Sequence, residues 1–218
     1  MIKYLDAHCH LLDGDIPADI GVITNATNPT EWGRVIALVK THTNVFGAIG
    51  IHPWYIGNLP PDWDTYMYDL LSQNPDIMVG EIGLDKHKPD MDTQISVFER
   101  QLEIAHELQR GIHVHCVGAW NHILQIFKSH RSKIPPFVLF HRYNGNPKDI
   151  ERLAHDYNAY FSYHQICPEL MDATPSTRMF LETDSTAPEQ IVAFTNTVAT
   201  LYPDCNFYNN MQRMLTNG

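Results

Sequence analysis

Asp6-Ala7-His8-Cys9-His10 stands near the amino terminus, directly after Tyr4-Leu5, and the segment has the pattern of a short buried strand. Because side chains alternate along a strand, we expect His8 and His10 on one face together with Asp6, and Cys9 on the other. Two imidazoles a few ångströms apart can bind one metal ion. An H-x-H pair alone is equally typical of two partly buried histidines, so the interpretation depends on later strands supplying further ligands.

The composition predicts a single globular domain over residues 1–218. The chain has 218 residues, of which 44% are hydrophobic, and this is enough for one large core. No apolar run reaches membrane-spanning length, and the four cysteines form no C-x-x-C pattern, so we expect a cytoplasmic protein with reduced thiols, no membrane contact and no obligate protein partner. The net charge of -10, with no basic run, repels polyanions at long range. Thirteen histidines are many for this length, which prompts a search for a metal site.

Eight segments have the apolar composition of buried strands: residues 4–10, 21–26, 45–51, 77–85, 112–116, 137–140, 159–163 and 179–184. Amphipathic helices are expected between most of them, the clearest from Thr93 to Arg110 with Gly111 at its C′ position. The connection after the first strand is too short for a full helix, and the one after the seventh, from Gln165 to Arg178, holds two prolines and can form one short helix at most. Alternating β and α segments predict an α/β fold, a compact (β/α)8 TIM-like barrel with some trimmed connections. An open doubly wound sheet is the alternative.

Ionisable side chains recur near the carboxyl ends of five expected strands, where a barrel places its active site. A buried strand normally carries apolar residues, and unpaired polar groups there would cost several kcal/mol each, roughly, unless cations bind them. The candidate ligands are four imidazoles and two carboxylates: His8, His10, Glu81, His115, His141 and Asp184.

This set suits two ions rather than one, with Glu81 bridging them, and we expect one or two divalent metal ions. Imidazole-rich sites favour Zn, Mn, Fe or Co over Mg alone, but the sequence does not distinguish these metals. Two such ions can hold a hydroxide and stabilise both oxygens of a displacement. Asp184 is the candidate to orient or deprotonate the attacking water, so Asp184 and Glu81 are the expected catalytic residues.

These motifs resemble the TatD-type metal-dependent hydrolases, the TatD-related deoxyribonucleases within the amidohydrolase superfamily. The matching stretches are Asp6–His10, Gly50-Ile51-His52-Pro53, Gly80–Asp85, Val114-His115, His141 with Gly145, Leu181–Asp184 and Asn210–Leu215. The resemblance implies a TIM-like barrel, metal ligation by the same six residues, and hydrolysis of phosphodiester bonds in DNA. It also places His52 near the substrate phosphate, and the alternative is that His52 only caps the loop beside Pro53.

The sequence departs from the family pattern at some positions. Two residues after His115 the family usually has an arginine, and here Val117 removes that bidentate phosphate clamp. Arg142, where the family usually has a small residue, either compensates as a substrate-binding residue or is a surface charge. His164 is expected as a rim histidine, with a position reaching into the pocket as the alternative. His113 is expected one layer below His115, either as a core group or as a partner of a ligand.

Three functions remain open from the sequence. The first is a divalent-metal phosphodiesterase acting on DNA ends or short nucleic acids. The second is a metallohydrolase of a small phosphoester, lactone or amide, which the acidic charge and Val117 favour. The third is a non-catalytic metal-binding scaffold. The complete ligand set argues against the third, because an idle site has no physical reason to keep Asp184 beside four imidazoles.

Overall fold

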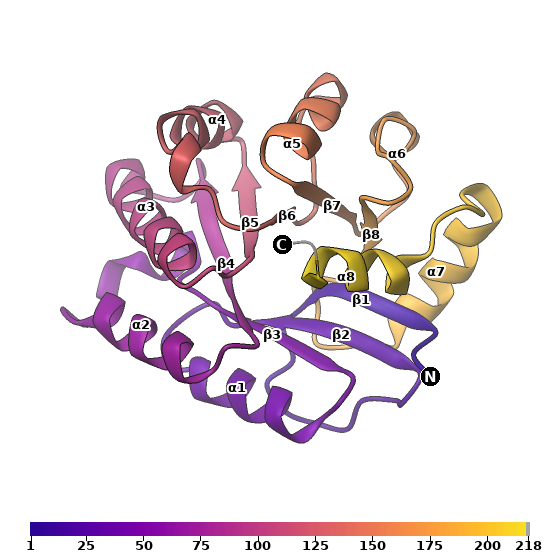
Figure 1. Cartoon of the computed structure of the whole chain (residues 1–218), viewed down its shortest axis with the longest axis horizontal. Helices are drawn as coiled ribbons and strands as arrows, with labels where there is room; N and C mark the ends of the chain where they lie inside the picture. The colour runs from indigo at the N-terminus through magenta and orange to yellow at the C-terminus, as the bar shows by residue number, and fades with distance from the viewer. Residues whose placement is uncertain (217–218) are drawn as a thin grey trace.

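The computed structural model describes residues 1–216, which form one eight-stranded parallel sheet in sequence order, surrounded by helices (Figure 1). The strands are β1 (Tyr4–Cys9), β2 (Ile20–Asn25), β3 (Val45–Ile49), β4 (Ile77–Asp85), β5 (Ile112–Val117), β6 (Val138–Phe140), β7 (Ala159–Tyr163) and β8 (Met179–Leu181). All seven neighbouring pairs are parallel, as alternating β and α segments require. The predicted barrel is confirmed, and the doubly wound alternative is wrong because the strand order never reverses.

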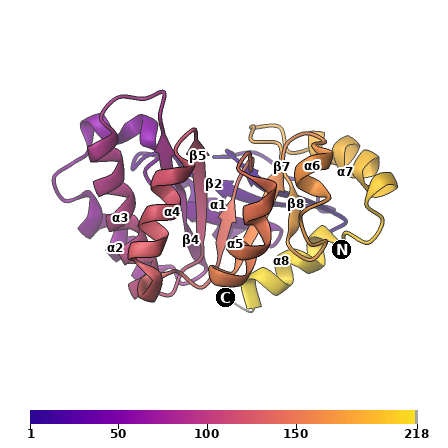
Figure 2. The same ribbon diagram turned by 90° about the horizontal axis from the view of Figure 1, so that it is seen from above.

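Helices cover the outside of the sheet, as Figures 1 and 2 show. The α-helices are α1 (Trp32–Thr41), α2 (Trp63–Gln73), α3 (Met91–Glu107), α4 (Trp120–Ser129), α5 (Ile150–Asp156), α6 (Pro168–Met171), α7 (Gln190–Leu201) and α8 (Phe207–Thr216). Short 3-10 helices are η1 (Pro53–Asn58), η2 (Arg131–Lys133) and η3 (Pro147–Asp149). Within the described residues, no helix is both long and apolar enough to cross a bilayer.

Two connections are trimmed, as predicted. A loop without a helix joins β1 to β2, and the four-residue α6 is the one helix between β7 and β8. The sheet closes at the seam between β1 and β8, just beyond the end of β8. There Asp184 N donates to His8 O at 2.9 Å, and His10 N donates to Ser185 O at 2.9 Å. The residues that follow β8 are therefore held beside the end of β1.

Helix α3 both packs on the sheet and fixes the loops around the site. Phe98, Leu102 and Ala105 are buried with the i, i+4, i+7 spacing predicted for its apolar stripe. Gln101 is buried too, and its side-chain amide accepts from Ile51 N at 2.7 Å and donates to Ile51 O at 3.2 Å. Because Ile51 follows β3, this amide fixes the start of the loop that carries the next residues into the site.

The predicted C-terminal cap of α3 is wrong by two residues. Gln109, not Gly111, adopts the left-handed conformation, with φ +53°, and Arg110 N donates to Ala105 O at 2.7 Å. Gly111 is required for a different reason, because a Cβ there would lie 2.0 Å from the Phe137 ring. The glycine admits an aromatic side chain from the neighbouring β6 segment.

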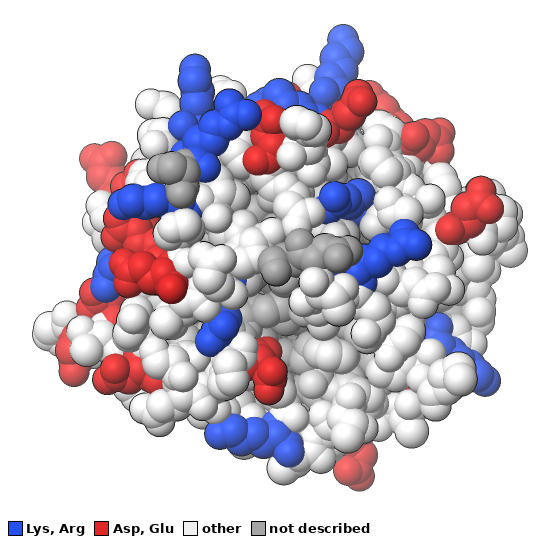
Figure 3. Space-filling model, viewed as in Figure 1, with Lys and Arg blue, Asp and Glu red and all other residues white. Residues whose placement is uncertain are grey.

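Acidic and basic side chains are mixed around the edge of the face that carries α8 (Figure 3). Leu215 of α8 lines a cavity of about 410 Å³ with residues at the beginnings of β3 and β4, including Val45 and Ile77. Helix α8 therefore lies at the amino-terminal end of the barrel. The polar side chains predicted to form the site stand at the opposite end.

Candidate metal centre

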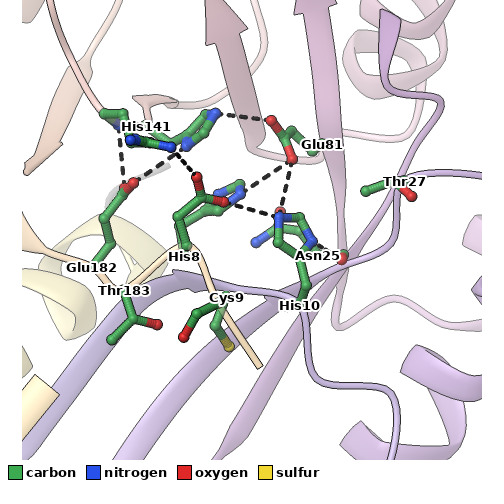
Figure 4. A network of polar contacts seen from close by, with 12 residues as sticks. His8, Cys9, His10, Asn25, Thr27, Glu81, His141, Glu182 and Thr183 are labelled. Atoms are coloured by element: carbon green, nitrogen blue, oxygen red, sulfur yellow. Dashed lines mark hydrogen bonds and ion pairs between the residues drawn. The ribbon is translucent and has the colours of Figure 1, made fainter. Parts of the chain in front are cut away.

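Strands β1, β4 and β8 bring three of the predicted ligands together around Glu81, the carboxylate expected to bridge two metal ions. Glu81 Oε2 lies 3.3 Å from His8 Nε2 and 3.4 Å from His10 Nε2. His10 Nε2 also lies 3.1 Å from Asp184 Oδ1, although the two residues are 174 positions apart. Figure 4 shows His8 and His10 turned towards Glu81, while the Cys9 thiol points away and contacts Ile23 O at 3.7 Å. The alternation predicted for the first strand is confirmed.

Strands β5 and β6 supply the other imidazoles from the opposite side of the same carboxylate. Glu81 Oε1 lies 2.8 Å from His115 Nδ1 and 2.8 Å from His141 Nε2, with His52 Nε2 at 3.2 Å. Gly83 makes this approach possible, because its φ of +147° brings β4 so close that a Cβ would lie 1.9 Å from His115 O. The four predicted imidazole ligands therefore converge on the Glu81 carboxylate, and Asp184 joins them through His10.

Hydrogen bonds to the far sides of two rings free their other nitrogens to bind a metal. His10 Nδ1 lies 2.9 Å from Asn25 O, and a carbonyl can only accept, so Nδ1 carries the proton. His141 Nδ1 faces Glu182 Oε1 at 3.3 Å in the same manner. In the neutral rings, Nε2 of His10 and Nε2 of His141 thus each carry a lone pair that is directed at Glu81.

The donor set fits a divalent cation. A neutral imidazole lone pair and a carboxylate oxygen are both acceptors, so their close contact requires a proton or a cation between them. The buried nitrogens His8 Nδ1 and His115 Nε2 have no hydrogen-bond partner among the residues that the structure describes. Four sets of three ligand atoms lie within 4.8 Å of one another: His8, His10 and Asp184; His8, Glu81 and His141; His52, Glu81 and His115; His141, Glu182 and Asp184.

The electrostatics of the cluster favour a mixture of charged and neutral rings. Burial alone would lower the pKa of His141, but the charges of Glu81 and Glu182 outweigh it and hold that pKa well above its ordinary value. Burial dominates for His8 and His115 and lowers the pKa of both. Because their pKa is lowered, the rings of His8 and His115 stay neutral near pH 7 and can bind a cation.

His52 differs from the other rings in its tautomer. Its Nδ1 accepts from Trp54 N at 3.1 Å, so in the neutral ring the proton is on Nε2. That Nε2–H faces Glu81 Oε1 and can donate to an anion, whereas a protonated nitrogen cannot ligate a metal. The geometry therefore makes His52 a hydrogen-bond donor at the edge of the cluster.

Arg142 lies at the mouth of the site rather than away from it. Its Nη1 donates to Asp184 Oδ2 at 2.6 Å, and its Nη2 lies 3.1 Å from His164 Nε2. His164 is exposed, which confirms the prediction of a rim histidine. The guanidinium thus stands beside Asp184 in the position of a charge that can meet an incoming anion.

Glu182 is missing from the set predicted from the sequence. It is buried, faces His141, accepts from Arg142 N at 3.3 Å and also accepts from the Ser162 hydroxyl. The signal that could have found it is the one used for Glu81, an acid inside a short apolar strand end. His113 is buried with both ring nitrogens unpartnered, which confirms that it belongs to the core.

The cluster opens into a cavity of about 410 Å³. Five residues of the cluster line this cavity: His10, His52, Glu81, His115 and Asp184. Arg142 lines it too. A second space of about 310 Å³ lies on the other side of Arg142, against Val117 and His164. A small anionic group could enter the first cavity and reach the cluster directly.

Comparison with known protein families gives a match over most of the chain. The family model described as TatD related DNase matches residues 5–200. The chain belongs to the TatD related DNase family. The resemblance predicted from the motifs is thereby confirmed.

The TatD-family relatives share moderate sequence identity with this chain. A 3'-5' ssDNA/RNA exonuclease TatD of Klebsiella pneumoniae is 26% identical over 176 residues, which cover 76% of this chain and 66% of that protein. An uncharacterized metal-dependent hydrolase of Methanocaldococcus jannaschii is 27% identical over 171 residues, covering 71% of this chain and 66% of its own length. The chain thus spans about two thirds of the length of these relatives.

Among solved structures, the TatD homologue YjjV of Escherichia coli aligns with 99% of this chain and 96% of its own, with a TM-score of 0.81 and 21% identity. At this identity the likeness supports the barrel fold alone.

Proposed function

We propose that this TatD-family protein is a divalent-metal-dependent phosphodiesterase that hydrolyses DNA ends or short single-stranded nucleic acid. The observation that carries the proposal is the convergence of His8, His10, His115 and His141 on Glu81, with Asp184 beside them at a cavity. The family supports the same reaction class, because its model is described as a DNase and one relative is named as an ssDNA/RNA exonuclease.

The residues divide into ligands and groups that act on water and substrate. His8, His10, Glu81, His115, His141 and Asp184 would hold one or two divalent ions, with Glu81 shared between them. Such ions, when bound, lower the pKa of a water and offset the charge of the phosphate. The proposal leaves open which of Zn, Mn, Mg, Co or Fe is used.

Three side chains are assigned roles in moving the proton and in binding the phosphate. Asp184 Oδ1, already 3.1 Å from His10, accepts the proton of the attacking water as the water oxygen bonds to phosphorus and the phosphorus–oxygen bond to the leaving nucleoside breaks. Asp184 then gives that proton to the leaving oxygen. His52 Nε2–H donates to a non-bridging phosphate oxygen. Arg142 leaves Asp184 to pair with the same phosphate, in place of the guanidinium that Val117 lacks.

The test combines metal analysis with two substitutions. We expect one or two ions per chain, and we expect His10→Ala and Asp184→Asn each to lower hydrolysis of a single-stranded oligonucleotide by at least about a thousandfold while the far-UV CD spectrum is unchanged. Asp13→Asn, on the exposed loop after β1, is the matched control. Full activity in either site variant would remove the mechanism.

A small phosphoester, lactone or amide is the second candidate substrate, because the chain carries a net charge of -10 and Val117 instead of an arginine. Assays of the Mn²⁺-loaded protein on an oligonucleotide, on a p-nitrophenyl phosphodiester and on a small lactone separate the two. Turnover of the lactone alone would eliminate the phosphodiesterase. Full metal content without turnover on any of the three would favour the scaffold.

A further inference from the structure

Trp54 is a large aromatic side chain that the fold holds at the surface of the site. Its side chain is 55% exposed although it lines the same cavity as His10, Glu81 and Asp184. The neighbouring Tyr55 lines this cavity too and is 47% exposed. An exposed aromatic pair beside a candidate active site, rather than in the core, is typical of a surface that binds a partner molecule.

Hydrogen bonds hold both the indole ring and the backbone of Trp54. Its indole Nε1–H donates to Asp85 Oδ2 at 2.7 Å, and its backbone N–H donates to His52 Nδ1 at 3.1 Å. Asp85 is itself buried, and Gln94 of α3 holds its backbone by accepting from Asp85 N at 2.8 Å. A ring held in this way loses little conformational entropy when a ligand stacks on it.

A cation accompanies the ring. Lys88 Nζ lies 4.0 Å from the centroid of the Trp54 ring, and the ring centroid is 5.3 Å from that of His52. The surface thus combines an aromatic plane and an ammonium group, and the aromatic ring is next to His52, the imidazole proposed to bind the phosphate. A nucleotide is complementary to this surface, because it joins a planar base that can stack to a phosphate whose negative charge can pair with a cation.

We propose that Trp54, with Lys88, forms a stacking subsite for an unpaired nucleobase next to the phosphodiester that is cleaved. The inference rests on the proposed phosphodiesterase and deepens it, because it assigns a binding subsite for one base of the single-stranded substrate. Base stacking on an aromatic ring is sequence-tolerant and does not depend on a basic surface. It therefore gives a chain of net charge -10 a means to hold a polyanion.

The first arm of the test is kinetic. For the Mn²⁺-loaded protein acting on a thymidine pentanucleotide, we expect Trp54→Leu to raise KM about tenfold with kcat within about twofold, and Trp54→Phe to keep most of the affinity. With an oligonucleotide whose terminal unit is abasic, we expect the wild-type protein to show the same raised KM as Trp54→Leu. On that substrate, Trp54→Leu should raise KM no further. Tyr66→Leu, on α2, removes an aromatic that is 49% exposed outside the cavity and should behave as wild type.

The second arm measures binding without turnover. Fluorescence anisotropy of a labelled pentanucleotide, with Asp184→Asn as the background to prevent cleavage, should give a dissociation constant about tenfold weaker when Trp54→Leu is added. Equal affinities with and without Trp54, or no binding at all, would overturn the subsite. Absence of oligonucleotide hydrolysis by the metal-loaded wild type would refute the proposed function instead, and the binding arm would still decide on Trp54.

Discussion

Glu182 shows how a single buried carboxylate can set the chemistry of a neighbouring ligand. It faces His141 Nδ1 at 3.3 Å, so the His141 proton is held on the far side of the ring from Glu81. The Ser162 hydroxyl and Arg142 N hold the other Glu182 oxygen. This contact fixes both the tautomer and the ring orientation, which are what a metal-binding imidazole needs.

We therefore expect Glu182→Gln to weaken divalent-metal affinity by roughly 10- to 100-fold while the barrel stays folded. The neutral amide no longer favours the His141 tautomer that leaves Nε2 free. Competition titration with a chromophoric chelator measures the affinity, and Glu189→Gln, at an exposed position before α7, is the matched control. Unchanged affinity in Glu182→Gln would mean that His141 does not depend on this partner.

At the scale of elements, two glycines contribute to stability in opposite ways. Gly33 is an exposed residue inside α1, and a Cβ there meets nothing within 4 Å. Gly111 lies between α3 and β5, where a Cβ would lie 2.0 Å from the Phe137 ring. Helix propensity governs the first position and close packing governs the second.

Gly33→Ala should raise the free energy of unfolding by about 0.5–1 kcal/mol, because alanine is the better helix former and has open space. Gly111→Ala should lower it by roughly 1–3 kcal/mol, because Phe137 must move. Urea unfolding of the two variants beside the wild type checks both signs. The same sign in both variants would contradict the packing assigned to Gly111.

The periodicity of apolar residues predicts the eight strands and the helix of Phe98 and Leu102, because local burial patterns depend on the chain alone. The cap of that helix is not predictable in this way. Gln109 takes the left-handed conformation at a steric cost because the chain must turn early enough to bring Gly111 against Phe137, which follows α4 in the sequence. A contact between distant segments thus overrides the local preference for glycine.

The same limit applies to the candidate site. Ligand types at strand ends predict the convergence of the six residues, because a parallel barrel has only one carboxyl-terminal mouth. The hydrogen bonds that hold the loops around the site cannot be deduced from the strand ends. Trp54 reaches Asp85 through a side-chain hydrogen bond across 31 positions, and only the folded loops show that contact.

For the whole molecule, barrel closure depends on the seam between β1 and β8, where the backbone pairs lie beyond β8. Asp6 is fully buried there and receives two bonds from one residue, Thr183 N at 3.0 Å and Thr183 Oγ1 at 2.5 Å. Burial raises the pKa of Asp6 to about 7 even though these two donors favour its charged form. The carboxylate at the seam therefore depends on Thr183 for much of its solvation.

Thr183→Val keeps the volume of the side chain but removes the hydroxyl donor, so it leaves one Asp6 oxygen without its partner. We expect the free energy of unfolding to fall by roughly 1–3 kcal/mol, the cost of an unsatisfied buried acceptor. Thr200→Val, where the hydroxyl bonds within the exposed surface of α7, should change it by less than about 0.5 kcal/mol. The seam also holds Asp184 beside His8, so Thr183→Val should weaken metal binding together with stability. A loss of stability with full metal affinity would show that barrel closure and the metal site are independent.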